Sequence, residues 1–378
     1  MAVGLYIHIP FCIKKCGYCD FVSYPYDAGL AASYLSALEK EMALCSREFG
    51  GEQKVFGSIY LGGGTPTALT GGQVAGIIDR CRNHFSLAGD VEITVECNPG
   101  TVDPEKMDTI RKSGVNRVSI GVQAYQQRLL SGLGRIHTWR EVVQAADSCR
   151  SAGFDNISFD LIFGIPGQTR NDWQETMDRV LEMSPRHISA YCLKIEPGTP
   201  LHREVTTGPV TPCDEDLELE MFWCTVDKLT GCGFKHYEIS NFALPGWEAR
   251  HNLIYWHNEE YLGLGPAAHS MLNGIRFNNV ESVELYIKKL NRGELPVSQA
   301  RVLTVTEQMA ETVFLGLRLI DGLDPGVFAE RFGRTINEVY GDRLEKLVCL
   351  ELLEAGENRL KLTKKGLPLA NEVFVEFI

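Results

Sequence analysis

The sequence predicts an α/β fold, an open and partial (β/α)6 barrel followed by a mostly helical C-terminal domain. Strand-like and helix-like segments alternate over residues 1–232, in six successive units. Such units form a parallel sheet with right-handed crossovers, and six are fewer than the eight that close a full barrel. A flat, doubly wound sheet is the alternative, because periodicity alone does not separate the two.

Each element rests on a local pattern. Runs rich in β-branched and aromatic residues indicate strands at GLYIHIP, FGSIYLGGG, VEITVEC, NRVSIGVQ, NISFDLIFG and HISAYCLKI. The segments between them predict helices over 30–48, 70–85, 103–113, 138–151, 170–183 and 214–231. In the third helix Asp103 can cap the start, Pro104 fits the first turn, and Gly114 suits a left-handed end.

The pattern changes after the sixth unit. Residues 233–300 are rich in aromatic, His and Asn residues with little periodicity, which indicates a connecting region of ordered loop and short strands. Residues 301–378 show three helical segments, then a hairpin-like strand pair and a last helix. That order resembles a winged-helix module.

Composition excludes several classes of protein. The 378 residues are 44% hydrophobic and 23% charged, with a net charge of −12, which argues against broad nucleic-acid or membrane-surface binding. The tail has only the small basic cluster Lys361, Lys364 and Lys365, so we expect no DNA binding there. No signal peptide or long apolar run is evident. We therefore expect a cytoplasmic protein that reaches membranes only through partners.

Three of the twelve cysteines cluster directly after the first strand, at Cys12, Cys16 and Cys19. The other nine are scattered singly, which predicts buried free thiols in a reducing compartment. A structural zinc site needs four ligands, and only His8 is close; its alternation with Tyr6 is that of a half-buried strand residue. Three thiolates suit a [4Fe–4S] cluster with one iron open to a bound molecule.

With Tyr18 before its last cysteine, this C-x3-C-x2-C loop resembles the signature of the radical S-adenosylmethionine (SAM) superfamily. The resemblance covers the whole first domain, residues 1–232. It implies that the amine and carboxylate of SAM chelate the open iron. Reduction, which needs an electron donor, then cleaves SAM to methionine and a 5′-deoxyadenosyl radical.

Polar residues near the carboxyl ends of the next strands fit the same chemistry. In the loop Leu61–Pro66, glycines let backbone amides approach the methionyl group of SAM. Glu96 is placed to accept hydrogen bonds from ribose hydroxyls, and Gln123 and Asp160 follow on the next two strands. Each residue alone could be a satisfied buried polar group, but three on successive strands favour a ligand.

The segments YIHIPFC, GGGTPT, SIGVQ and DLIFGIPGQT, with the C-terminal appendage, resemble the oxygen-independent coproporphyrinogen III dehydrogenase branch. Arg135 lies off the strands, where a solvated loop cation is the alternative; the resemblance gives it a carboxylate to bind. The resemblance implies SAM contacts from Tyr6, Tyr18, Gly63, Gly64, Thr65, Glu96, Gln123, Arg135, Asp160 and, through its backbone, Lys194.

Two departures separate the chain from the true dehydrogenases. Those enzymes carry a further cysteine two residues after the third cluster cysteine, where this chain has Phe21. They also have an extension before the first strand, whereas this sequence enters the strand directly. Both differences match the HemW group of heme chaperones.

That group's other mark is H-N-x-x-Y-W, present here as His251, Asn252, Tyr255 and Trp256. Heme needs an axial ligand and flat apolar walls, which the imidazole and the two aromatic rings can provide. The alternative is that these aromatic residues fill a domain junction while the histidine makes a routine hydrogen bond. His257 and His269 are rival ligands.

The resemblance thus implies a heme chaperone that delivers heme to a respiratory hemoprotein, with its cluster tied to delivery and to assembly as a homodimer. The alternative is an active dehydrogenase that oxidatively decarboxylates two propionates of coproporphyrinogen III to give protoporphyrinogen IX. The sequence leaves open whether the chain is an enzyme.

Overall fold

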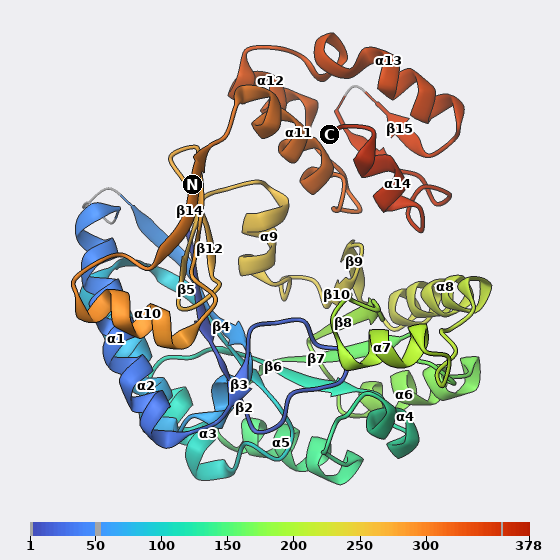
Figure 1. Cartoon of the computed structure of the whole chain (residues 1–378). Coiled ribbons are helices and arrows are strands. Elements are labelled where there is room, and N and C mark those ends of the chain that lie inside the picture. The colour runs from blue at the N-terminus through green and yellow to red at the C-terminus, as the bar shows by residue number, and fades with distance from the viewer. Residues whose placement is uncertain (1–2, 50–53, 357) are drawn as a thin grey trace.

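The computed structural model describes residues 3–49, 54–356 and 358–378. Its centre is a twelve-stranded sheet with the order β14-β13-β12-β11-β1-β4-β5-β6-β7-β8-β10-β9. The six strands from β1 to β8 in this order are parallel and follow one another in chain order. A doubly wound sheet reverses its direction of growth at a switch point, whereas a barrel grows in one direction. The predicted partial (β/α)6 barrel is therefore confirmed (Figure 1).

The barrel elements lie close to their predicted positions. The strands are β1 (Val3–Ile9), β4 (Val55–Gly63), β5 (Ser86–Cys97), β6 (Arg117–Gln123), β7 (Asn156–Phe163) and β8 (His187–Cys192). The main helices are α1 (Ala28–Glu48), α2 (Gly71–His84), α3 (Pro104–Lys112), α5 (Trp139–Ser151), α6 (Arg170–Glu182) and α8 (Glu215–Gly231). Each of these helices begins and ends within two residues of the prediction.

Residues 233–300, predicted as a connecting region, also contribute strands to the sheet. β9 (Lys235–Glu238) and β10 (Asn241–Ala243) extend the sheet beyond β8. Four strands extend it beyond β1: β11 (Tyr261–Leu264), β12 (His269–Leu272), β13 (Ile275–Asn279) and β14 (Val297–Val302). Both edges of the barrel sheet are thus lengthened by this region.

The sequence missed several short helices. They are α4 (Gln127–Gly132), α7 (Pro200–Thr206), α9 (Arg250–Trp256) and α10 (Val283–Asn291). The expectation of loop around the HNxxYW motif is therefore wrong, since the motif lies on α9. A helix of seven residues makes only about two turns, which is too short to show a helical period.

The C-terminal region has the predicted order of helices and hairpin. It consists of α11 (Val305–Gly316), α12 (Pro325–Phe332), α13 (Ile336–Cys349), the hairpin β15 (Leu353–Ala355) and β16 (Leu360–Leu362), and α14 (Ala370–Val375). These elements enclose a hydrophobic core of their own. Figure 1 shows α9 between the barrel and this domain, and α9 packs on α11.

Backbone pairing attaches the C-terminal domain to the sheet. Leu319, in the turn after α11, forms an antiparallel bridge with Glu238 at the outer edge of β9. The Ile239 amide donates to the Arg318 carbonyl at 3.1 Å, and the Ile320 amide donates to the Tyr237 carbonyl at 3.1 Å. The C-terminal domain therefore covers a sheet edge that would otherwise expose unpaired backbone groups.

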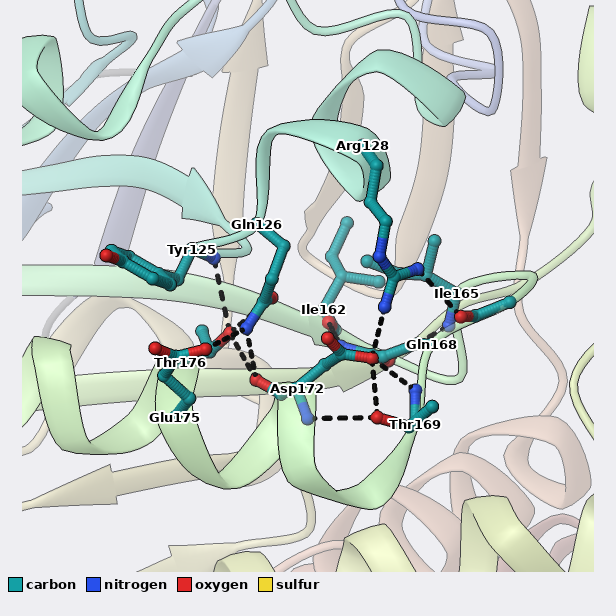
Figure 2. Close-up of polar contacts among 11 residues, drawn as sticks. Tyr125, Gln126, Arg128, Ile162, Ile165, Gln168, Thr169, Asp172, Glu175 and Thr176 are labelled. Carbon is teal, nitrogen blue, oxygen red and sulfur yellow. Dashed lines mark hydrogen bonds and ion pairs between the residues drawn. The ribbon is translucent and has the colours of Figure 1, made fainter.

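A polar network holds the open ends of β6 and β7 against α6 (Figure 2). Gln168 is buried and accepts from the Ile165 amide at 3.1 Å while its amide group donates to the Ile162 carbonyl at 3.4 Å. Arg128, which follows β6, forms an ion pair with Asp172 in the first turn of α6. The segment GIPGQT thus has a structural role, since its Gln168 fixes the backbone at the carboxyl end of β7.

The prediction that nine cysteines are buried is only partly right. Cys45, Cys81, Cys97 and Cys149 are buried, Cys213 and Cys224 are half-buried, and Cys192, Cys232 and Cys349 are exposed. The exposed thiols end elements or follow them, where an apolar sequence neighbourhood does not ensure cover. Among the described residues, no helix combines the length and the apolar character needed to cross a bilayer.

Candidate functional site

The cysteine loop follows β1 at the open end of the barrel. Cys12 ends the two-residue strand β2 (Phe11–Cys12), which pairs with β3 (Tyr24–Pro25), while Cys16 and Cys19 lie in the loop between them. The Gly17 amide donates to the Leu133 carbonyl at 3.0 Å, which ties the loop to the segment after α4. The three thiols are therefore carried by backbone that is held at both ends and in the middle.

The donor set fits an iron–sulfur cubane better than a zinc ion. Among the described residues, no three His, Cys, Asp or Glu side chains converge on one metal ion. Ligands of tetrahedral zinc would lie about 3.8 Å apart, whereas in a cubane each thiolate binds a different iron. His8 offers no fourth ligand, because Nδ1 lies 3.0 Å from the Tyr6 hydroxyl and Nε2 lies 2.7 Å from the Val22 carbonyl. It is fully buried, not half-buried as predicted.

Arg135 stands beside the cluster loop. Its guanidinium donates to the Tyr18 hydroxyl at 2.7 Å and to Asn98 Oδ1 at 2.7 Å, so it is anchored between the loop and the end of β5. Burial raises the pKa of the Cys16 thiol, and the positive charge of Arg135 opposes that rise. The Nε atom of Arg135 is buried without a hydrogen-bond partner. Arg135 is thus no solvated loop cation, and one N–H remains for an acceptor such as a carboxylate.

The glycine loop after β4 packs against the backbone of the cysteine segment. The Gly64 amide donates to the Ile9 carbonyl at 2.9 Å, the Thr65 amide donates to the Phe11 carbonyl at 2.6 Å, and the Gly63 amide donates to the Glu96 carboxyl. The Gly64 and Thr65 amides therefore have partners within the protein, and the contact of this loop with the methionyl group of SAM stays a prediction. The Thr65 hydroxyl donates to Cys12 Sγ at 3.5 Å, which joins the glycine loop to the first of the three cysteines.

Two half-buried carboxyl groups approach each other from β5 and β7, the strands on either side of β6. Burial and the nearby charge of Asp160 raise the pKa of Glu96 to about 7, and Tyr60 donates to Glu96 at 2.8 Å. Burial also raises the pKa of Asp160, although Ser189 and Ser119 donate to it. Such a pair suits a ligand that presents several hydroxyl or ammonium donors.

The remaining predicted SAM residues differ in placement. Gln123 ends β6 as a buried residue with φ of 66°, a strained value for a residue other than glycine that is held by the bulge before it. Tyr6 lies on β1 with its ring 6.3 Å from that of Tyr60. Lys194 is exposed, two residues beyond β8. The structure brings the other predicted residues together, whereas the backbone contact of Lys194 with SAM stays a prediction.

His251 is enclosed. It is 2% exposed, and its ring lies against that of Tyr60 with centres 5.1 Å apart. Nδ1 lies 2.8 Å from the Ser58 hydroxyl and Nε2 lies 2.9 Å from the Tyr255 hydroxyl. Burial lowers the pKa of His251 to about 3, so the ring is neutral. Neither nitrogen is open to a heme iron in this arrangement, and the alternative of a histidine hydrogen-bonded at a domain junction describes it better.

The rest of the motif is spread around α9. Tyr255 is turned inward to His251, Asn252 is half-buried, and Trp256 lies at the end of the helix toward the C-terminal domain. His257 caps α9 and is exposed, and His269 begins β12 and is also exposed. The two rival histidines therefore have the access that His251 lacks.

Sequence reasoning missed three residues that hold the site. Tyr60 binds Glu96 and stacks on His251, while Asn98 joins Arg135 to Thr65, whose hydroxyl it contacts at 2.7 Å. Ser119 donates to Asp160 at 2.9 Å. Asn98 could have been predicted, because it directly follows the end of a strand. Tyr60 and Ser119 lie within strands, where the sequence does not distinguish them from core residues.

Comparison with known proteins identifies the families and relatives that this chain resembles. Residues 6–180 match the radical SAM superfamily and residues 303–369 match the HemN C-terminal domain. A protein named heme chaperone HemW from Bacillus subtilis is 37% identical over 99% of this chain and 98% of its own, and one from Lactococcus lactis is 35% identical over 99% and 96%. The structure of Escherichia coli coproporphyrinogen III oxidase (HemN), a radical SAM enzyme, covers all of this chain and 90% of its own with a TM-score of 0.87; at 24% identity this shows the fold alone.

Proposed function

Because the chain belongs to the HemW family within the radical SAM superfamily, we propose that it binds heme and transfers it to an acceptor hemoprotein, on a scaffold with one [4Fe–4S] cluster. The observation that carries the proposal is the full-length similarity to relatives named heme chaperones. The HNxxYW motif and Phe21 in place of a fourth cysteine support it from the sequence.

The cluster would be held by Cys12, Cys16 and Cys19, leaving one iron for SAM. Bound there, SAM could be cleaved reductively to a radical. This chain's own residues would orient it: Glu96 and Asp160 accept hydrogen bonds from its hydroxyl or ammonium groups, and Arg135 offers its free N–H to a carboxylate. Tyr18 and Asn98 fix the guanidinium in place.

For the heme iron, the exposed His257 and His269 are better placed than His251, since an axial ligand must present a free nitrogen on an accessible face. Ligation by His251, the first expectation, would require α9 to give up the contacts to Ser58 or Tyr255. We further propose a cytoplasmic location, a respiratory acceptor hemoprotein, an electron donor for the cluster, and a homodimer.

Heme titration of the cluster-reconstituted protein, followed by absorption under anaerobic conditions, tests the proposal. We expect saturable binding, reported by a shift of the Soret band. The affinity for heme should fall about tenfold or more in His257→Ala or His269→Ala, the loss expected for one axial bond. The folded state of each variant is checked by its thermal transition. Absence of saturable binding in the wild-type protein would contradict the proposal.

The dehydrogenase alternative is tested in the same preparation. Coproporphyrinogen III, SAM and a strong reductant are supplied, and porphyrin products are separated after oxidation. We expect no protoporphyrinogen IX beyond that of a control without protein. Sustained formation of that product would make the chain an oxidative decarboxylase and not a chaperone.

A further inference from the structure

Buried polar atoms without partners gather at the junction of the barrel and the C-terminal domain. Among the described residues, nine buried side-chain nitrogen or oxygen atoms have no hydrogen-bond partner. Four of these belong to one group of neighbouring side chains: Glu238 Oε2, Asn241 Oδ1, Trp256 Nε1 and Arg318 Nε. Because an unpaired buried polar atom costs about 1–3 kcal/mol, such a group indicates a place that a polar ligand would fill.

Arg318 is the charged centre of this group. It lies in the turn after α11, where its backbone carbonyl is fixed by the Ile239 amide at 3.1 Å. Its side chain is 24% exposed, and its nearest carboxylate oxygen, Glu238 Oε2, lies 3.6 Å from Nη2, longer than a hydrogen bond. The guanidinium is thus held by an incomplete ion pair and keeps N–H groups for a further acceptor.

Trp256 forms the second wall. The guanidinium carbon of Arg318 lies over the Trp256 ring, 4.3 Å from its centre, a cation–π contact that holds the charged group against the indole. The indole N–H is buried and unpaired beside it. Two types of N–H donor and a flat aromatic face therefore meet at the end of α9, and a carboxylate attached to a planar apolar group suits them.

We propose that Arg318 and Trp256 form a binding site for a propionate carboxylate of heme. The inference rests on the proposed function, because it takes heme as the ligand. Glu238 does not block it: Oε1 accepts from the Asn241 amide and from the Ser240 amide, so its charge is partly satisfied on the far side from Arg318. Burial also raises the pKa of Glu238, which favours the neutral form of this carboxyl group.

The test compares heme with heme dimethyl ester, whose propionates are esterified and carry no charge. Both ligands are titrated into the full-length, cluster-reconstituted protein in the same dilute detergent. The wild-type protein should bind heme about tenfold more tightly than the ester, the gain expected from one charge-assisted contact. Arg318→Gln should lose that preference by weakening heme binding alone.

A matched variant separates recognition from folding. Arg318→Gln leaves Glu238 buried without its counter-charge, so the double variant Arg318→Gln with Glu238→Gln removes both charges and should show the same lost preference. Equal affinity of the wild-type protein for heme and ester, or equal weakening of both ligands in the double variant, would overturn the inference and leave heme binding itself intact. Failure of the wild-type protein to bind either ligand would overturn the proposed function as well.

Discussion

His251→Ala should lower the free energy of unfolding by about 2–4 kcal/mol, because it leaves a cavity and two buried hydroxyls without partners. The ring is fully enclosed, lies against Tyr60, and contacts the hydroxyls of Ser58 and Tyr255. Chemical denaturation of wild-type and variant protein measures the effect. An accessible heme ligand in the same position would give a change near zero.

The same variant should alter the dependence of stability on pH. The folded-state pKa of His251 is about 3, lowered by burial, against an unfolded value of 6.5. Below pH 6.5 the unfolded chain binds a proton that the folded chain does not, so stability falls as pH falls through this window, by up to about 1.4 kcal/mol per pH unit for that proton. His251→Ala should lose this contribution between pH 6.5 and the folded-state pKa of about 3.

Two control variants make the result specific. Tyr255→Phe removes only the hydroxyl that contacts Nε2 and should cost about 1 kcal/mol. His257→Ala changes an exposed residue and should leave stability within about 0.5 kcal/mol of wild type. If His251→Ala unfolded like the wild-type protein and lost only heme binding, the enclosed position would be wrong and direct ligation right.

Gly64→Ala should destabilise the protein by about 1–3 kcal/mol and reduce cluster loading, because the added methyl has no space. A Cβ at Gly64 would lie 2.6 Å from the Phe11 carbonyl oxygen, 2.8 Å from the Ile9 carbonyl oxygen and 2.9 Å from the Phe11 amide. All three are backbone atoms of the segment that leads into Cys12, so the segment itself must move. Denaturation and iron content after reconstitution measure the two effects.

Gly72→Ala is the matched control. Gly72 lies in the first turn of α2, is exposed, and would present its Cβ to open space. Alanine there should stabilise the helix by about 0.5–1 kcal/mol and leave iron content unchanged. Equal behaviour of the two variants would show that the close packing of the glycine loop on the cysteine segment does not matter.

Long periodic elements could be predicted from the sequence, because their local and tertiary preferences agree. The third helix has Asp103 as its N-cap, accepting from the Lys106 amide, with Pro104 in the first turn, as its residues indicate. Short elements could not, since α9 owes its place to packing between β4 and α11 rather than to a period of its own. The contacts between α9 and β4 cannot be predicted from a local sequence pattern.

The candidate site could be predicted from the sequence only in part. Glu96 lies near the end of β5 and Asp160 lies in the second half of β7, with β6 between the two strands. Because the carboxyl ends of parallel strands meet at one edge of the sheet, the approach of these two side chains follows from the pattern. The burial of His251 does not follow from it. A motif of His, Asn, Tyr and Trp fits a heme wall and an aromatic junction equally well, and only the contacts to Ser58 and Tyr60 distinguish them.

One measurement tests the central claim, that a three-cysteine loop holds a [4Fe–4S] cluster with an open iron. Protein reconstituted anaerobically is analysed for metal and sulfide, and the reduced cluster is examined by electron paramagnetic resonance with and without SAM. We predict about four irons and four sulfides per chain and a spectrum that changes when SAM is added. Zinc in place of iron, or a spectrum that SAM leaves unchanged, would contradict the account.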